Sequence, residues 1–276
     1  MKKLILSAKK VQKTFANNGE QVHVLSNVNL DIYDGDFTVI MGSSGAGKST
    51  LLYALSGMDK ATSGQVIYHK DGKESDVVGM KEKELAVLRA KEFGFVFQQM
   101  HLVSNLSLLE NVLVTGYLNK EKSPAKTKEK AKALLERMNL SKVMDHLPSK
   151  VSGGEQQRCA IARAEINDPA IVFADEPTGA LNRKNTTEVL DLLTQLNEEG
   201  QSIVMVTHDL KAALKGEAMS GADTSVGSHY MTIIGLYHST QAGYVLCVES
   251  WGKLYYIRYS SYAKALSYFT NILYVR

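Results

Sequence analysis

The segment GSSGAGKS at residues 42–49 has the residue types and the spacing of a phosphate-binding loop. It fits the pattern G-x-x-x-x-G-K-[ST], and it lies after an apolar run and before a helix-forming segment, as that pattern requires. Glycines let backbone N–H groups close around phosphates, and the start of the helix adds its positive end. Lys48 is expected to reach the β and γ phosphates, and Ser49 to offer a hydroxyl to Mg²⁺. The segment therefore predicts nucleotide binding.

Further polar residues follow three other apolar runs. We expect Asp175 to hold the magnesium shell and Glu176 to polarise an attacking water. His208 is expected to hydrogen-bond the γ-phosphate, although a lone histidine in such a place is usually structural. Gln98 follows the run FGFVF and could bind magnesium or the water. Together these residues predict hydrolysis of a nucleoside triphosphate.

Short, continuous apolar runs must position these groups. The runs at 37–41, 171–174 and 203–206 are rich in β-branched residues and do not alternate with polar ones. This pattern is typical of parallel strands covered on both faces. Ligands of open parallel sheets lie beyond the carboxyl ends of the strands, so we expect one shared site there.

The flanking segments predict the other layers. Helices are expected over residues 49–55 and 186–198, each followed by a glycine. Alternation within 27–32 and at Val66 and Tyr68 indicates an antiparallel layer. Residues 126–138 predict an amphipathic helix in a helical subdomain, with its apolar face in an ordinary core and no site on it.

A second candidate anion cradle is the segment VSGGEQQR at 151–158, which opens a predicted helix on two glycines. With it, the order and spacing of the motifs resemble the ATP-binding subunit of an ABC transporter. The resemblance covers roughly residues 4–213. It depends on the phosphate loop, Gln98, the signature at 151–157, the pair Asp175 and Glu176, the loop GALN at 179–182, and His208.

The resemblance implies an α/β fold of the P-loop NTPase class (ABC-type ATPase), with a mostly parallel core sheet, an antiparallel β layer and a helical subdomain. The ATP-binding domain is expected over residues 1–215, with the helical subdomain inserted at roughly 99–160. Residues 216–276 form a divergent tail whose order the sequence leaves open.

The resemblance also implies ATP and Mg²⁺ as cofactors. The catalytic residues are then expected to be Glu176, His208, Gln98 and Lys48, and the metal ligands Ser49, Gln98 and Asp175. The residues expected to bind the nucleotide are Phe15, Gly42, Ser43, Ser44, Gly45, Ala46, Gly47, Lys48, Ser49, Thr50, Ser152, Gly153, Gly154 and Glu155.

In this family, Ser152 and Gly154 would cover the γ-phosphate held by the other subunit of a head-to-tail dimer, which explains a second cradle. A homodimer of ATP-binding subunits is therefore expected. Phe15 matches the aromatic residue that stacks on adenine, but a core phenylalanine is an equal alternative. Val151 replaces the usual leucine and Asn182 an aspartate, which predicts altered coupling without loss of hydrolysis.

The implied partner is a separate integral-membrane permease, contacted by the segment after Gln98 that includes Met100, Leu102, Val103 and Leu106; core packing is the alternative. The segments GMDKATSGQV, FVFQQMHLVSNLSLLENV and ADEPTGALN resemble the subgroup of lipoprotein-release, macrolide-export and bacitracin-type peptide-resistance transporters. The segment MGSSGAGKSTLLYALSGMD favours the peptide branch. A soluble ABC-type ATPase acting on nucleic acid or ribosomes, and a nucleotide-dependent regulator without turnover, are the other classes. We expect no nucleic-acid partner, because the chain shows no basic tract.

The composition is that of a globular protein, and the resemblance implies a location on the cytoplasmic face of a bacterial membrane. The 276 residues are 44% hydrophobic and 22% charged, with a net charge of +3 that indicates no particular partner. Two cysteines indicate a reducing compartment, with Cys159 expected to be a small buried hydrophobe. We expect no signal peptide and no membrane helix.

The divergent tail differs in composition from the rest of the chain. Residues 218–276 hold only six charged residues but nine of the 13 tyrosines. Either the end of the gene is read in a different frame, which we favour, or a divergent segment packs on the domain or on a partner.

Overall fold

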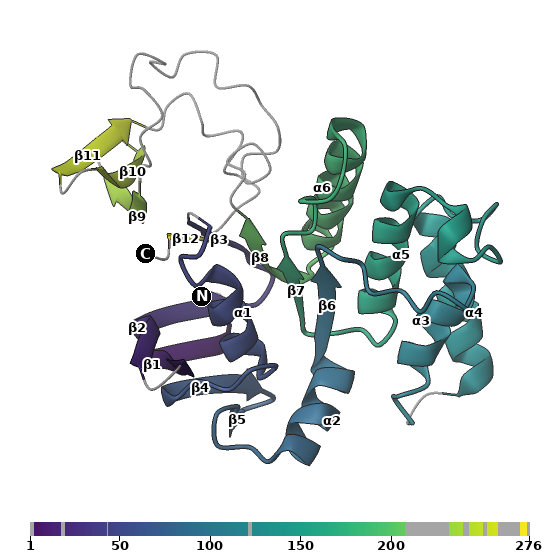
Figure 1. The fold of residues 1–276 in the computed structure, drawn as a ribbon, viewed down its shortest axis with the longest axis horizontal. Coiled ribbons are helices and arrows are strands. Elements are labelled where there is room, and N and C mark those ends of the chain that lie inside the picture. Colours follow the sequence, from purple (N-terminus) through teal and green to yellow (C-terminus); the bar gives the residue numbers. More distant parts are fainter. Residues whose placement is uncertain are drawn as a thin grey trace.

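A five-stranded parallel sheet brings together the strand ends that carry the polar residues (Figure 1). The computed structural model describes residues 3–17, 20–42, 44–120 and 123–207, and the backbone of four later strands. The order across the sheet is β12-β3-β8-β7-β6, and each neighbouring pair is parallel. The strands are β3 (Phe37–Met41), β6 (Phe93–Phe97), β7 (Ile171–Asp175), β8 (Ser202–Thr207) and β12 (Asn271–Tyr274). The predicted parallel strands are thus confirmed.

Strands β3, β7 and β8 are buried along their whole length. In β7, Val172 and Ala174 belong to one apolar core, whereas Ile171 and Phe173 belong to another on the opposite face of the sheet. Both faces need apolar residues, which is why these runs do not alternate with polar ones.

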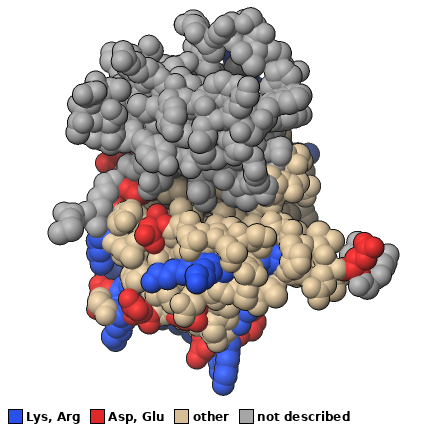
Figure 2. Space-filling model, turned by 90° about the vertical axis from the view of Figure 1, so that its left-hand side faces the viewer, with Lys and Arg blue, Asp and Glu red and all other residues tan. Residues whose placement is uncertain are grey.

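One face is covered by an antiparallel sheet in the order β2-β1-β4-β5 and by helices α1 and α2. The predicted antiparallel layer is confirmed. Figure 2 views this side, and basic and acidic side chains are interspersed over its described part. The elements are β1 (Leu4–Asn17), β2 (Glu20–Tyr33), β4 (Ser63–Lys70), β5 (Lys73–Asp76), α1 (Lys48–Ser56) and α2 (Glu82–Glu92).

The other face is covered by helices that share its core. Helix α4 confirms the predicted amphipathic helix, with Ala131 and Leu135 buried. Helix α3 was not predicted, although Ser107 and Glu110 form a capping box at its start. The helices are α3 (Leu108–Gly116), α4 (Pro124–Arg137), α5 (Gly153–Glu165) and α6 (Arg183–Glu198), with a 3₁₀ turn, η1 (Pro148–Lys150), before α5.

Two further predictions concern these helices. Helix α6 begins three residues earlier than the sequence indicated, because the Asn182 side chain accepts a hydrogen bond from the Asn185 N–H and caps it. Cys159 is fully buried in α5, as expected, and burial raises the pKa of its thiol to about 12. No helix in the described ranges is long and apolar enough to cross a membrane.

The tail contributes strands to two sheets. Strands β9 (Thr232–Ser239), β10 (Gly243–Ser250) and β11 (Lys253–Arg258) form an antiparallel sheet in the order β11-β10-β9. Strand β12 instead joins the main sheet, with Asn271 opposite Thr38 and Tyr274 opposite Met41. It covers the edge of β3, the strand that leads into the phosphate loop. The domain boundary near 215 and both explanations of the tail stay predictions.

Glu165, at the end of α5, is partly buried, and its solvent-shielded Oε1 has no hydrogen-bond partner among the described residues. Burial raises the pKa of Glu165 to about 7; Asp168 and Glu199 also raise it, whereas Lys130 and Arg137 lower it. Between about pH 4.5 and 7 the folded chain therefore binds more protons here than the unfolded chain. This group loses its stabilising contribution as the pH rises through that window.

Glu165→Gln is accordingly expected to raise the free energy of unfolding by about 1 to 3 kcal/mol at pH 8 and to change it little at pH 4.5. Urea denaturation at both pH values measures the difference. Glu136→Gln, which neutralises an exposed carboxylate on α4, is the matched control. An equal effect of Glu165→Gln at the two pH values would contradict this account.

Candidate nucleotide-binding and hydrolysis site

The phosphate loop ends at Gly47, which caps α1 in a left-handed conformation with φ of 86°. A Cβ atom at Gly47 would lie 2.9 Å from Val24 Cγ1, so glycine is needed for both its conformation and its close approach. Gly45, at φ of 80°, borders open space. Since glycine has no capping side chain, the first N–H groups of α1 remain suited to an anion.

Asp175, at the end of β7, is held by two hydroxyls of α1. Ser49 Oγ donates a hydrogen bond to Asp175 Oδ1 at 2.7 Å, and the Tyr53 hydroxyl donates to Oδ2 at 2.6 Å. Asp175 is 8% exposed, so these bonds satisfy a carboxylate that has lost most of its water. Burial, followed by the bond to Asp175, raises the pKa of Tyr53. Carboxylate and hydroxyl oxygens are ligands that suit Mg²⁺, and their convergence fits the predicted metal site.

Tyr53 was not among the residues predicted from the sequence. Its signal was the spacing, because Ser49 and Tyr53 are four residues apart and lie on the same face of a helix. Tyr53 thus fixes the second oxygen of a carboxylate whose first oxygen faces the phosphate loop.

Glu176 follows directly and lies beside the loop lysine. Its Oε1 is 3.9 Å from Lys48 Nζ, and its backbone N–H donates to the Val206 carbonyl at 2.9 Å. Its φ of 48° is in the left-handed region, which glutamate rarely adopts and which costs about 1 kcal/mol or more. This strained turn places the Glu176 carboxylate beside the Lys48 ammonium group.

Gln98 is exposed just beyond the end of β6. A Cβ atom on Gly179 would lie 2.8 Å from Gln98 Nε2, so the glutamine side chain packs against the backbone of the 179–182 loop. The Gly179 N–H donates to the Glu176 carbonyl at 3.0 Å. The fold thus brings Gln98 to the loop that follows the two carboxylates.

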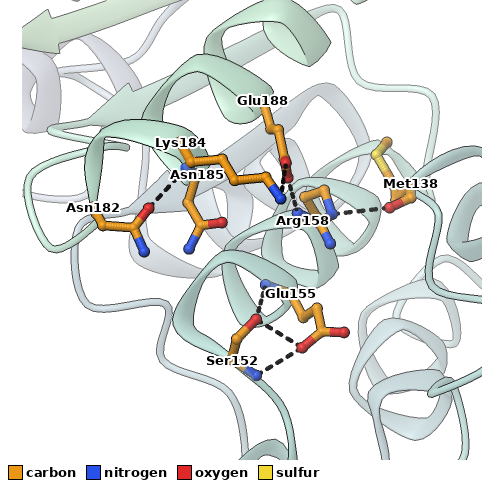
Figure 3. A network of polar contacts seen from close by, with 8 residues as sticks. All are labelled: Met138, Ser152, Glu155, Arg158, Asn182, Lys184, Asn185 and Glu188. Carbon is orange, nitrogen blue, oxygen red and sulfur yellow. Dashed lines mark hydrogen bonds and ion pairs between the residues drawn. The ribbon is translucent and has the colours of Figure 1, made fainter.

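The signature residues begin α5 and form a capping box (Figure 3). Ser152 Oγ and the Ser152 N–H both donate to Glu155 Oε2 at 2.7 Å, and these bonds lower the pKa of Glu155. Ser152 and Gly153 are exposed, whereas Gly154 is buried. A Cβ atom on Gly154 would lie 2.5 Å from the side chain of Asn185.

The phosphate loop and the signature belong to opposite faces of the main sheet. Helix α1 packs in the core shared with the antiparallel layer, and α5 packs in the core of the other helices. Figure 1 likewise shows α1 and α5 on opposite sides of β6 and β7. The two helix starts that the sequence predicts to bind anions are therefore separated within one chain.

Arg158, the last residue of the segment at 151–158, holds the signature helix in place. No role was predicted for it from the sequence. Its Nε donates to the Met138 carbonyl at 3.0 Å, and its Nη1 pairs with Glu188 at 2.7 Å (Figure 3). These contacts fasten α5 to the end of α4 and to α6. Asn182 caps α6 in the same network, so its side chain has a structural role in this chain.

Phe15 is 42% exposed, and Lys13 Nζ lies 5.0 Å from its ring centroid. The alternative of a core phenylalanine is therefore wrong, because the Phe15 side chain is exposed to solvent. Ser43 and His208 lie outside the described residues.

Comparison with known proteins agrees with this geometry. The ABC transporter family model matches residues 25–179. The chain is 40% identical over 210 residues to the lipoprotein-releasing system ATP-binding protein LolD of Idiomarina loihiensis, covering 76% of this chain and 90% of LolD. It is 44% identical over 199 residues to the macrolide export ATP-binding/permease protein MacB 1/2 of Paracoccus denitrificans, covering 72% of this chain but 29% of MacB.

A solved structure is also similar. The dimeric post-hydrolysis state of the ATP-binding cassette MJ0796, bound to ADP and Pi, superposes with a TM-score of 0.69 at 39% identity, covering 77% of this chain and 92% of that one. The fold and the site define an ABC-type ATPase of the P-loop NTPase class. The chain belongs to the ABC transporter family, as an ATP-binding and ATP-hydrolysing subunit.

Removal of the Tyr53 hydroxyl tests the arrangement around Asp175. Tyr53→Phe leaves this buried carboxylate with one hydroxyl partner fewer, so we expect the free energy of unfolding to fall by about 1.5 to 3 kcal/mol. Chemical denaturation measures it, and Tyr117→Phe, at an exposed tyrosine, serves as the control. Equal stability of Tyr53→Phe and wild type would show that the hydroxyl does not support Asp175.

Proposed function

We propose that this chain powers a separate membrane permease and encloses its ATP between two copies of itself. The observation that carries the proposal is the separation of the two anion-binding helix starts on opposite faces of the sheet. Ser152 and Gly153 are exposed and do not belong to the core that holds α1. A second copy, placed head to tail, supplies this cradle to the phosphate loop, and the dimeric state of the similar cassette supports this arrangement.

In each site the loop at 42–49 and Thr50 bind the phosphates, with Lys48 at the γ position. Ser49, Asp175 and Gln98 hold Mg²⁺, which neutralises charge on the phosphate oxygens when it is bound. Phe15 stacks on the base. The γ-phosphate then joins the two protomers, and its hydrolysis releases them.

Glu176 polarises the attacking water. Its position 3.9 Å from Lys48 places the base beside the cation that binds the γ-phosphate. Gln98, packed against Gly179, orients the water or completes the metal site, and His208 contacts the γ-phosphate. Glu155 and Ser152 of the partner complete the enclosure through the N-terminus of α5.

The permease contact is proposed beside Gln98. A cavity of about 410 Å³ lies there, bordered by residues of α2, β6, α3 and α5. Val103, from the segment after Gln98, is 46% exposed, and Met58 and Leu118 on the cavity wall are 46% and 61% exposed. Leu102 packs against the core, so the core alternative holds for that residue. The lining of the cavity includes Met58, Arg89, Phe95, Phe97, His101 and Leu118.

For the cargo, an antimicrobial peptide of the bacitracin type is our proposal, because the phosphate-loop segment favours that branch. Lipoprotein release is the second candidate, since LolD is 40% identical and similar in length. The similarity to transporter proteins argues against the alternative of a soluble ATPase that acts on nucleic acid or ribosomes. Substrate choice belongs to the permease, so cargo is the part of the proposal that this chain constrains least.

Glu176→Gln keeps the size of the side chain but removes the base. We expect kcat for ATP to fall at least about 100-fold with KM nearly unchanged, and ATP to shift the variant to a dimer in size-exclusion chromatography. Glu198→Gln, on the exposed side of α6, should hydrolyse ATP as the wild type does. If wild type and Glu176→Gln hydrolyse ATP equally slowly, the chain is a regulator without turnover.

Reconstitution in lipid tests the transport function. With a candidate peptide-resistance permease, we expect the ATPase rate to rise several-fold and to rise again when bacitracin is added. Stimulation by a lipoprotein would favour the second candidate instead. Stimulation by nucleic acid without any permease would contradict the proposal.

A further inference from the structure

Helix α5 lies directly against β6 and runs antiparallel to it. A Cβ atom on Gly94 would be 2.7 Å from the Ala164 carbonyl oxygen, so helix and strand approach backbone to backbone. Seven helical residues farther toward the N-terminus, Gln157 Nε2 donates to the Phe97 carbonyl at 3.1 Å. Seven helical residues and three strand residues both span about 10 Å, which explains why the two contacts fit together. The helix is thus fixed in register against the strand.

The same helix also holds the chain on the far side of Gln98. Arg163 Nη2 donates to the Met100 carbonyl at 2.6 Å, and Nη1 donates to the His101 carbonyl at 2.7 Å. The guanidinium fork binds two successive carbonyls, which one ammonium group does less well. Side chains of α5 therefore bind backbone both before and after Gln98.

The burial of the Gln157 amide is energetically unfavourable. Gln157 is fully buried, and its Oε1 has no hydrogen-bond partner among the described residues. A buried amide with an unused acceptor is less favourable than an apolar side chain of the same size. Packing alone therefore does not explain an amide here, and the donor to Phe97 is its evident role.

We propose that Gln157 and Arg163 are positioning residues for ATP hydrolysis, which place Gln98 by holding the carbonyls of Phe97, Met100 and His101. Gln98 packs against Gly179, so a shift of this backbone changes its reach into the site. Because α5 begins at Ser152, a displacement of the signature also moves Gln98 of the same chain. The inference rests on the proposed role of Gln98 and is independent of the permease.

The test is a double-mutant cycle on the full chain, with kcat and KM for MgATP measured without permease. Gln157→Leu keeps the volume and removes the donor. We expect it to lower kcat about tenfold, to leave KM within about twofold, and to keep the melting temperature within about 3 °C. In a Gln98→Ala background, Gln157→Leu should lower kcat less than twofold further, because the residue it positions is gone.

Gln201→Leu is the matched control. Like Gln157, Gln201 donates from its side-chain amide to backbone carbonyls. Its partners are the carbonyls of Pro169 and Ser202 at the start of β8, away from the site. Its kcat should equal that of wild type. If Gln157→Leu does not fold, Arg163→Lys replaces it in the cycle, with an expected loss of about threefold or more and the same lack of additivity.

The outcomes separate two failures. If Gln98→Ala lowers kcat and the two substitutions act independently, or if neither Gln157→Leu nor Arg163→Lys lowers kcat, the positioning inference is overturned and the role of Gln98 stands. If Gln98→Ala leaves kcat unchanged, the proposed role of Gln98 fails, and the inference fails with it.

Discussion

The hydrogen bonds from Ser49 and Tyr53 to Asp175 are the contacts on which the site depends. They join α1, which opens at the phosphate loop, to β7, the buried centre of the sheet. A carboxylate at 8% exposure is tolerated only with such partners, and the same oxygens suit a hard cation. The hydrogen bonds that stabilise the buried Asp175 carboxylate therefore also bring together the oxygens that suit Mg²⁺.

Around this centre, the two faces of the sheet have different tasks. The face with α1 carries the phosphate loop, whereas the face with α5 presents a capped, exposed helix start. Arg158 fastens that helix to α4 and α6, and Gly154 leaves room for Asn185. The signature helix is thus fastened by its own chain, while Ser152 and Gly153 remain exposed.

Several features could be predicted from sequence because they follow from local periodicity or from a motif whose spacing is chemical. The buried strands, α4, the phosphate loop and the pair Asp175 and Glu176 are of this kind. Helix α3 and Tyr53 were missed, and the start of α6 was placed too late. Tyr53 has no motif of its own, since its role arises only when β7 lies beside α1. Phe15 was ambiguous, because exposure depends on what packs over a strand.

The pairing of the tail could not be predicted from the sequence either. Its composition marks a break in the sequence, but nothing in that composition predicts that β12 pairs with β3 at the edge of the main sheet. Pairing between strands more than 200 residues apart depends on which edge the rest of the fold leaves open.

By itself, the sequence determined where the phosphate-loop motif lies and where the buried strands run, because backbone conformation, hydrophobic period and motif spacing are local properties. Only the tertiary structure decided which elements contact one another: Tyr53 with Asp175, Gln98 with the backbone at Gly179, and α5 with the backbone on both sides of Gln98. These contacts join residues 60 to 122 positions apart, so they depend on the packing of whole elements and no local pattern in the chain predicts them.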